Sequence, residues 1–119
     1  MIVHEPTGKI LARNVEVADG FWSRLRGLMF RRNFEQDSGI LFSLKKPKKF
    51  SVHTFFVFFP IDLIYLDSDL VVVDLKEDMG PWSTYSPNTK ASYLLELVSG
   101  KIDDVGVKVG DEVVRRDEG

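Results

Sequence analysis

The sequence predicts an α+β fold in which mostly antiparallel strands form a partly closed, barrel-like sheet with one amphipathic helix packed on it. Three observations support this fold class. Short apolar segments rich in β-branched and aromatic residues alternate with turn residues along most of the chain. One stretch alone has clear helical periodicity. No repeat, linker or low-complexity tract divides the 119 residues, so we expect a single domain over 1–119.

The chain opens with two loosely alternating segments, 2–4 and 9–17, which flank a Pro-Thr-Gly turn and predict a hairpin. Asp19 then stands where a helix N-cap belongs, and apolar side chains follow it at helical spacing. This pattern predicts a helix over 20–31 that covers the sheet. Arg24 falls at the border of its apolar stripe, at the rim of the core.

The central run over 50–67 is the most apolar part of the chain. It is too short and too polar for a membrane-spanning helix, which needs about 18 or more apolar residues. Pro60 lacks a backbone N–H, so it predicts a break between two strands over 51–58 and 61–67. Large apolar side chains on both alternating faces from Phe55 to Phe59 predict that neither face is open to water.

The remaining elements follow from turn residues and apolar runs. The segment Lys45–Lys49 is predicted to be a loop by its proline and its charge density, and 77–90 is predicted to be a long loop that Trp82 and Tyr85 keep ordered. The other predicted elements are strands over 39–44, 70–75 and 91–98, a turn over 67–69, a helical turn over 101–105, and a turn with a last strand within 107–113.

Composition removes several function classes. The chain has no cysteine, so disulfides, thiolate metal sites and cysteine nucleophiles are excluded. With two histidines and scattered acids we expect no metal site and no cofactor. The N-terminus shows no basic region followed by an apolar segment, so the expected location is cytoplasmic, without a membrane partner.

Five sequence blocks carry a family resemblance. They are Arg24–Arg31 with its Gly-Leu-Met, His53-Thr54-Phe55-Phe56, Phe59-Pro60-Ile61-Asp62, Leu95-Glu96 with Gly100, and Gly110-Asp111 before the last strand. In this order they resemble the domain of unknown function 192 family over nearly the whole chain. The resemblance implies a small β-rich domain with a short helix, found in bacteria and archaea, and no established activity. The chain departs from the family at Leu70, where a glycine commonly follows the Asp-x-Asp turn.

Two residues of the central run are candidates for chemistry. His53 is the only histidine there, and it is either a general base near neutral pH or a hydrogen-bonded strand residue. Asp62 shares its strand face with apolar residues, and a buried carboxylate must be paired or hydrogen-bonded. Its partner is expected to be Arg24 or backbone N–H groups around Pro60. Alternatively, Arg24, Asp62 and Thr54 line a pocket mouth where Arg24 holds an anion.

These residues support three hypotheses. The first is a binding domain for an unknown small molecule or protein, with a cleft between helix 20–31 and loop 77–90; its candidate residues are Arg24, His53, Thr54, Asp62, Trp82 and Tyr85. The second is a small hydrolase or lyase that uses His53 and Asp62 as acid and base. The third is nucleic-acid binding through Lys45–Lys49, which the pI of about 5.7 disfavours. Exposed sheet edges are compatible with a monomer or a weak dimer.

Overall fold

The computed structural model describes residues 1–18 and 34–117. The predicted helix over 20–31, including Arg24, lies outside the described residues. The elements in chain order are β1 (Ile2–His4), β2 (Ile10–Ala12), β3 (Asn14–Ala18), β4 (Ser38–Lys48), β5 (Val52–His53), β6 (Ile61–Leu66), β7 (Val72–Met79), β8 (Thr84–Tyr85), β9 (Ala91–Val98), α2 (Lys101–Val105) and β10 (Val113–Arg115).

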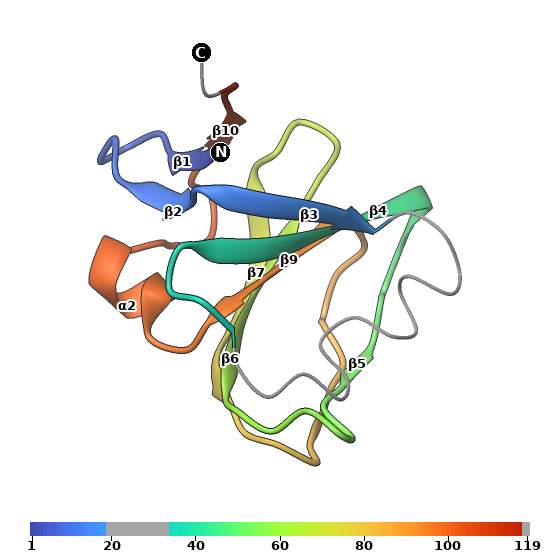
Figure 1. Ribbon diagram of the computed structural model, residues 1–119. Coiled ribbons are helices and arrows are strands. Elements are labelled where there is room, and N and C mark those ends of the chain that lie inside the picture. Colours follow the sequence, from blue (N-terminus) through green and yellow to red (C-terminus); the bar gives the residue numbers. More distant parts are fainter. Residues whose placement is uncertain (19–33, 118–119) are drawn as a thin grey trace.

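The strands form three sheets (Figure 1). The largest has the order β3-β4-β9-β6-β7, a second has the order β10-β1-β2, and β5 pairs with β8. Every pairing is antiparallel except that of β3 with β4. The predicted α+β class with mostly antiparallel strands is confirmed, although the sheets do not close into a barrel.

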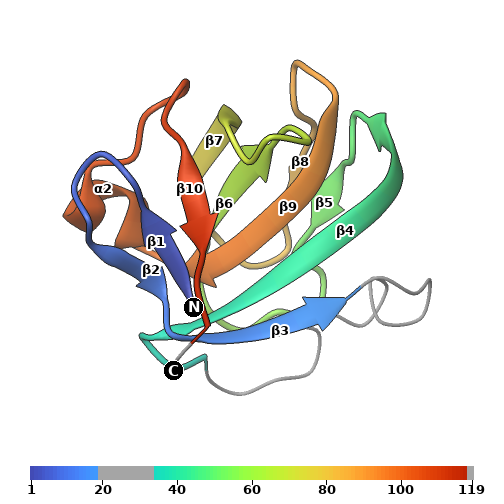
Figure 2. The same cartoon turned by 90° about the horizontal axis from the view of Figure 1, so that it is seen from above.

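The predicted opening hairpin is confirmed, because β1 pairs with β2 across the turn. Its second arm was expected as one strand over 9–17, and that prediction is wrong. Arg13 separates β2 from β3, and the two strands belong to different sheets. β3 pairs in parallel with β4, which requires a long connection, and residues 19–37 are long enough to provide one. Figure 2 shows β3, β4 and β9 side by side.

The core is organised around β6, whose six residues are all buried between β7 and β9. Because successive side chains of a strand point to opposite faces of the sheet, Ile64 and Leu66 lie in one apolar cluster. A second cluster on the other face contains Ile61, Leu63 and Tyr65. The strand therefore contributes to two cores, as expected for a strand covered on both sides. The predicted break at Pro60 and the strand that follows it are confirmed.

The predicted strand over 51–58 is wrong beyond His53. Residues 54–60 leave the sheet, and the side chains of Phe55, Phe56 and Phe58 are 41%, 41% and 54% exposed. The reason lies in the backbone. Thr54 accepts a hydrogen bond from the Val57 N–H at 3.1 Å, and Phe56 has a φ of 62°, which no strand accommodates. The expectation that neither face of this run meets water is therefore also wrong.

Two predicted loops contain regular structure. The loop predicted over Lys45–Lys49 is wrong, because β4 continues to Lys48, which pairs with Ala91 after a register shift. The proline in this part of β4 is tolerated because β3 pairs with β4 only as far as Phe42. The loop over 77–90 is interrupted by the end of β7 and by β8.

Leu70 explains why the strand predicted over 70–75 begins late, at Val72. Its φ of 63° is in the left-handed region, so it ends the predicted turn over 67–69 instead of opening a strand. This is the position where the resemblance implied a glycine. The predicted bounds of β9 and of α2 agree with the structure. The last strand was expected within 107–113, and that placement is wrong, because β10 begins at Val113 and runs to Arg115.

Candidate functional site

Thr54 joins two loops that lie far apart in the sequence. Its hydroxyl donates to the Gly80 carbonyl at 2.7 Å and accepts from the Ser83 N–H at 2.7 Å. Its backbone N–H donates to the Ser83 carbonyl at 2.8 Å, and its carbonyl accepts from the Trp82 N–H at 3.0 Å. The side chain is fully buried. Thr54 is therefore a scaffold residue that fixes the loop over 54–60 against the loop over 80–83.

This junction carries a contiguous aromatic surface formed by His53, Phe55, Phe56 and Trp82, which we call the aromatic platform. His53 and Phe55 stack with ring centroids 5.0 Å apart, and Phe55 lies 5.9 Å from Trp82. Phe56 meets Trp82 edge to face at 4.8 Å. Each ring neighbours the next at these centroid distances, so the four rings form one continuous aromatic surface.

The backbone of the platform is strained at two positions. Phe56 has a φ of 62° and Trp82 a φ of 59°, both in the left-handed region where bulky residues are outliers. Trp82 is 57% exposed, so burial of its ring does not compensate for this conformation. The Thr54 hydrogen bonds hold both loops in place and impose these angles.

Asp62 lies on β6 and is fully buried. One carboxylate oxygen accepts from the Asp78 N–H at 2.8 Å, and the other accepts from the Ile102 N–H at 2.9 Å. Ile102 lies in the first turn of α2, whose N-cap Gly100 has no side chain to satisfy these N–H groups. Asp62 therefore caps the helix from another element. The partners are backbone N–H groups, as one alternative expected, but they belong to β7 and α2 and not to the Pro60 break.

His53 lies at the surface, on the end of β5. Its Nδ1 accepts a hydrogen bond from the Phe55 N–H at 3.3 Å, and its ring forms part of the aromatic platform. Asp62 has both oxygens occupied inside the core. An acid and base pair must reach one substrate together, and these two side chains have no common surface.

Tyr85 belongs to the frame behind the platform. Its hydroxyl donates to Asp74 Oδ2 at 2.9 Å, and burial together with this hydrogen bond raises the pKa of Tyr85. Its ring lies 6.1 Å from that of Tyr65. The Tyr65 hydroxyl donates to the Phe50 carbonyl at 2.8 Å, and burial raises the pKa of Tyr65 far above its ordinary value. Both tyrosines are therefore neutral hydrogen-bond donors.

One polar cluster was missed by sequence reasoning. His4 is buried, its Nε2 lies 2.7 Å from Asp111 Oδ2, and its Nδ1 lies 2.7 Å from the Thr7 hydroxyl. Asp111 also accepts from the Lys108 N–H at 2.9 Å, and these hydrogen bonds lower its pKa. The cluster ties the opening hairpin to the turn before β10. A histidine three residues before a threonine in a turn was the only local signal.

Two classes of site find no support in the part of the chain that the structure describes. No group of three or more His, Cys, Asp or Glu residues within 1–18 and 34–117 is arranged to hold a metal ion. Over the same residues, no helix is long and apolar enough to cross a membrane.

Residues 2–115 match the model of the domain of unknown function 192 family, which is described as an uncharacterized ACR. The chain belongs to this family. A UPF0127 protein of Thermococcus sibiricus is 36% identical over 113 residues, which cover 95% of this chain and 73% of that protein. The UPF0127 protein PH1112 of Pyrococcus horikoshii is 33% identical over 115 residues, covering 95% and 96% of the two chains. The resemblance inferred from the sequence blocks is thereby confirmed.

Two solved structures of similar fold were found for this domain of unknown function 192 protein. A protein of Sinorhizobium meliloti 1021, described as a candidate transcription regulator, has a TM-score of 0.80 and 28% identity over 84% of this chain and 79% of that one. A protein of unknown function from Novosphingobium aromaticivorans has a TM-score of 0.79 and 23% identity over 85% of this chain and 74% of that one. The second likeness concerns the fold alone.

Proposed function

We propose that the protein is a non-catalytic interaction domain that binds a partner protein through the aromatic platform. The observation that carries this proposal is the conformation of Phe56 and Trp82, which are exposed and also strained. Left-handed backbone costs a residue with a side chain about 1–2 kcal/mol. Full burial of the ring does not offset this conformational free energy at either residue, because both side chains are exposed. Strain of this kind concentrates at binding and active sites, where function requires it.

The composition of the surface supports the same proposal. The described residues include six large hydrophobic side chains that are exposed, and four of them lie in or beside the platform: Phe55, Phe56, Phe58 and Trp82. Clustered exposed aromatics mark interaction surfaces, whereas scattered ones need no explanation. Aromatic side chains also dominate the binding energy of protein interfaces.

The frame beneath the platform favours a preorganised site. Because Thr54 ties both loops together through five hydrogen bonds to residues 80–83, the rings are ordered before a partner arrives. Preorganisation lowers the entropy cost of binding and so increases affinity. An apolar, proline-rich or aromatic segment of a partner suits a continuous aromatic surface of this type. The earlier expectation that Arg24 and helix 20–31 form the other wall stays a prediction, as do the single domain and the cytoplasmic location.

The enzyme hypothesis receives less support. Asp62 is occupied as a helix cap in the core, so His53 would act without it. Two observations favour nucleic-acid binding. Three exposed lysines lie close together in the sequence, namely Lys46, Lys48 and Lys49, and the similar Sinorhizobium protein is described as a candidate transcription regulator. Binding of this kind would weaken steeply as salt is raised, whereas an aromatic interface would not.

A peptide selection tests the proposal. A random peptide library is selected on the immobilised protein, and binders that also attach to the double variant Phe56→Ala and Trp82→Ala are removed. We expect surviving peptides whose affinity, measured by calorimetry, falls by about thirtyfold in either single variant, as for an interface hot spot. Val109→Ala is the matched control, because Val109 is 62% exposed and lies outside the platform. The proposal is refuted if no peptide survives this removal, or if the surviving peptides bind both single variants as tightly as the natural protein.

A further inference from the structure

Within residues 1–18 and 34–117, β3 offers a sheet edge that no second strand pairs with. It is the last strand of the five-stranded sheet, and β4 is its only strand partner among the described residues. The Asn14 N–H donates to the Asp37 carbonyl at 3.0 Å, and the register partner of Asn14 is Ser38. In a parallel ladder alternate residues bond to the same neighbour. The backbone groups of Val15 and Val17 therefore point away from β4, toward the open side of the sheet.

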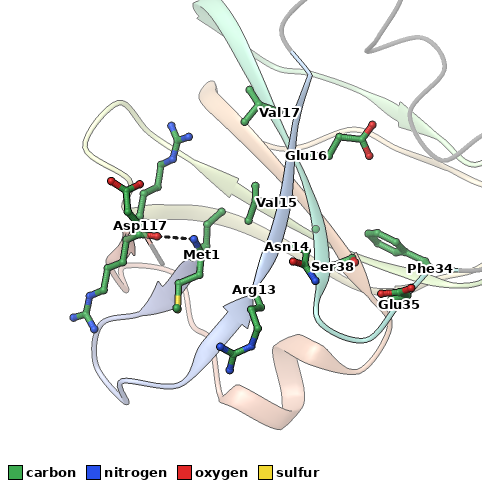
Figure 3. Close-up of a pocket in the computed structure, with 14 residues that line it drawn as sticks. Met1, Arg13, Asn14, Val15, Glu16, Val17, Phe34, Glu35, Ser38 and Asp117 are labelled. Atoms are coloured by element: carbon green, nitrogen blue, oxygen red, sulfur yellow. Dashed lines mark hydrogen bonds between the residues drawn. The ribbon is translucent and has the colours of Figure 1, made fainter. Parts of the chain in front are cut away.

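A groove with a volume of about 910 Å³ lies along β3 (Figure 3). Figure 3 shows Met1 and Asp117 on one side of the strand and Ser38, where β4 begins, on the other. The free edge of β3 therefore faces the groove. Val17 is 50% exposed here, which adds apolar surface to the free backbone groups.

The charges along this groove are uneven. Arg13, Arg115 and Arg116 line it together with Asp117, and Arg13 directly precedes β3. Figure 3 shows the acidic side chains Glu16 and Glu35 on the opposite side of the strand from Met1. The described partner of Arg116 is Glu5 at 3.8 Å, and both side chains are more than half exposed, so this pair exchanges readily for a ligand carboxylate. Arginine binds carboxylates through paired hydrogen bonds.

We infer that the free edge of β3 binds the acidic carboxyl-terminal segment of a partner protein as an added antiparallel strand. Antiparallel addition gives the more stable ladder. It places the carboxyl end of the added segment at the start of β3, beside the arginines. Recognition then comes from backbone hydrogen bonds to Val15 and Val17 and from carboxylate contacts to Arg115 and Arg116. This surface is separate from the aromatic platform, so the two proposals stand or fall independently.

The inference is tested with a synthetic peptide, Thr-Val-Thr-Val-Glu-Glu with a free carboxyl terminus, by fluorescence anisotropy and amide hydrogen exchange. We expect saturable binding, slower exchange at the amides of Val15 and Val17, and an affinity about tenfold weaker for the reversed sequence Glu-Glu-Val-Thr-Val-Thr. The double variant Arg115→Glu and Arg116→Glu should weaken binding by about tenfold or more. The matched control is Lys46→Glu with Lys49→Glu, two exposed lysines that do not line the groove and whose replacement should have little effect.

The backbone contribution is tested from both partners. Val15→Pro removes one outward N–H and leaves the ladder with β4 intact, so it should abolish binding. If that variant does not fold, a peptide with an N-methylated central valine tests the same hydrogen bond on the unmodified protein. Absence of binding at millimolar peptide, equal binding of the reversed peptide, or protection of other amides would overturn the inference. A dimer in sedimentation that protects Val15 and Val17 without peptide would also overturn it, because a second copy would then occupy the edge.

Discussion

Replacing Asp62 by Asn should destabilise the protein by about 3 kcal/mol. Both carboxylate oxygens accept backbone N–H groups, at 2.8 Å from Asp78 and 2.9 Å from Ile102, inside a fully buried site. An asparagine of the same shape keeps one acceptor and turns an NH2 group toward the other N–H. The unsatisfied N–H costs about 1–3 kcal/mol, and the remaining bond loses about 1 kcal/mol because it is no longer assisted by charge.

Urea unfolding followed by circular dichroism measures this change directly. For a chain of this size about 3 kcal/mol corresponds to a fall in Tm of about 10 °C. Amide exchange adds a local test. In Asp62→Asn the Ile102 N–H should exchange faster than in the natural protein, and this increase should be larger than for the other amides of α2. Asp69→Asn is the matched control, because Asp69 is exposed in the turn before β7. A loss below about 0.5 kcal/mol, the range of ordinary surface substitutions, would refute the capping role of Asp62.

Three further predictions concern the platform and the His4 cluster. Thr54→Val should lower the free energy of unfolding in urea by about 2 kcal/mol, because the part-buried Ser83 N–H loses its acceptor. Thr84→Val, at an exposed position, is the control, and equal losses in the two variants would contradict the role of Thr54 in joining the two loops. Trp82→Gly should be about 1 kcal/mol more stable than Trp82→Ala, since only glycine adopts its φ of 59° without strain; equal stabilities would show that no strain is stored there. Because its pKa is lowered from 3.8, Asp111 contributes stability that is present above that pH and is lost as the pH falls through its folded pKa. Acid titrations of stability should therefore fall less steeply for Asp111→Asn than for the natural protein, and identical slopes would exclude the contribution.

Much of the fold follows from local signals in the sequence. Pro60 ends one segment and starts another because it has no N–H, and this placed the start of β6 correctly. Ser99 and Gly100 stop β9, and Gly100 and Gly106 bound α2 with φ values of 95° and 85°. These features depend on residues next to each other in the chain, so they are readable without knowing the tertiary structure.

Long-range choices were not readable in this way. Apolar character predicts that Phe55 and Phe56 favour burial, but the hydrogen bonds of Thr54 to residues 80–83 direct this segment out of the sheet. The partners of Asp62 lie 16 and 40 residues away in the sequence. A carboxylate in an apolar strand must find donors, yet the sequence does not state which of many N–H groups supplies them.

The family, the fold class, the strand after Pro60 and the short helix follow from the amino-acid sequence, because these features depend on composition, periodicity and neighbouring residues. The folded arrangement, by contrast, decides that Asp62 caps α2, that Phe55 and Phe56 are exposed in the platform and that, within residues 1–18 and 34–117, β3 has one strand partner. The physical reason is the same in each case. Burial and hydrogen bonding are satisfied by the whole fold together, so the environment of one side chain depends on which distant segment supplies compatible groups to it.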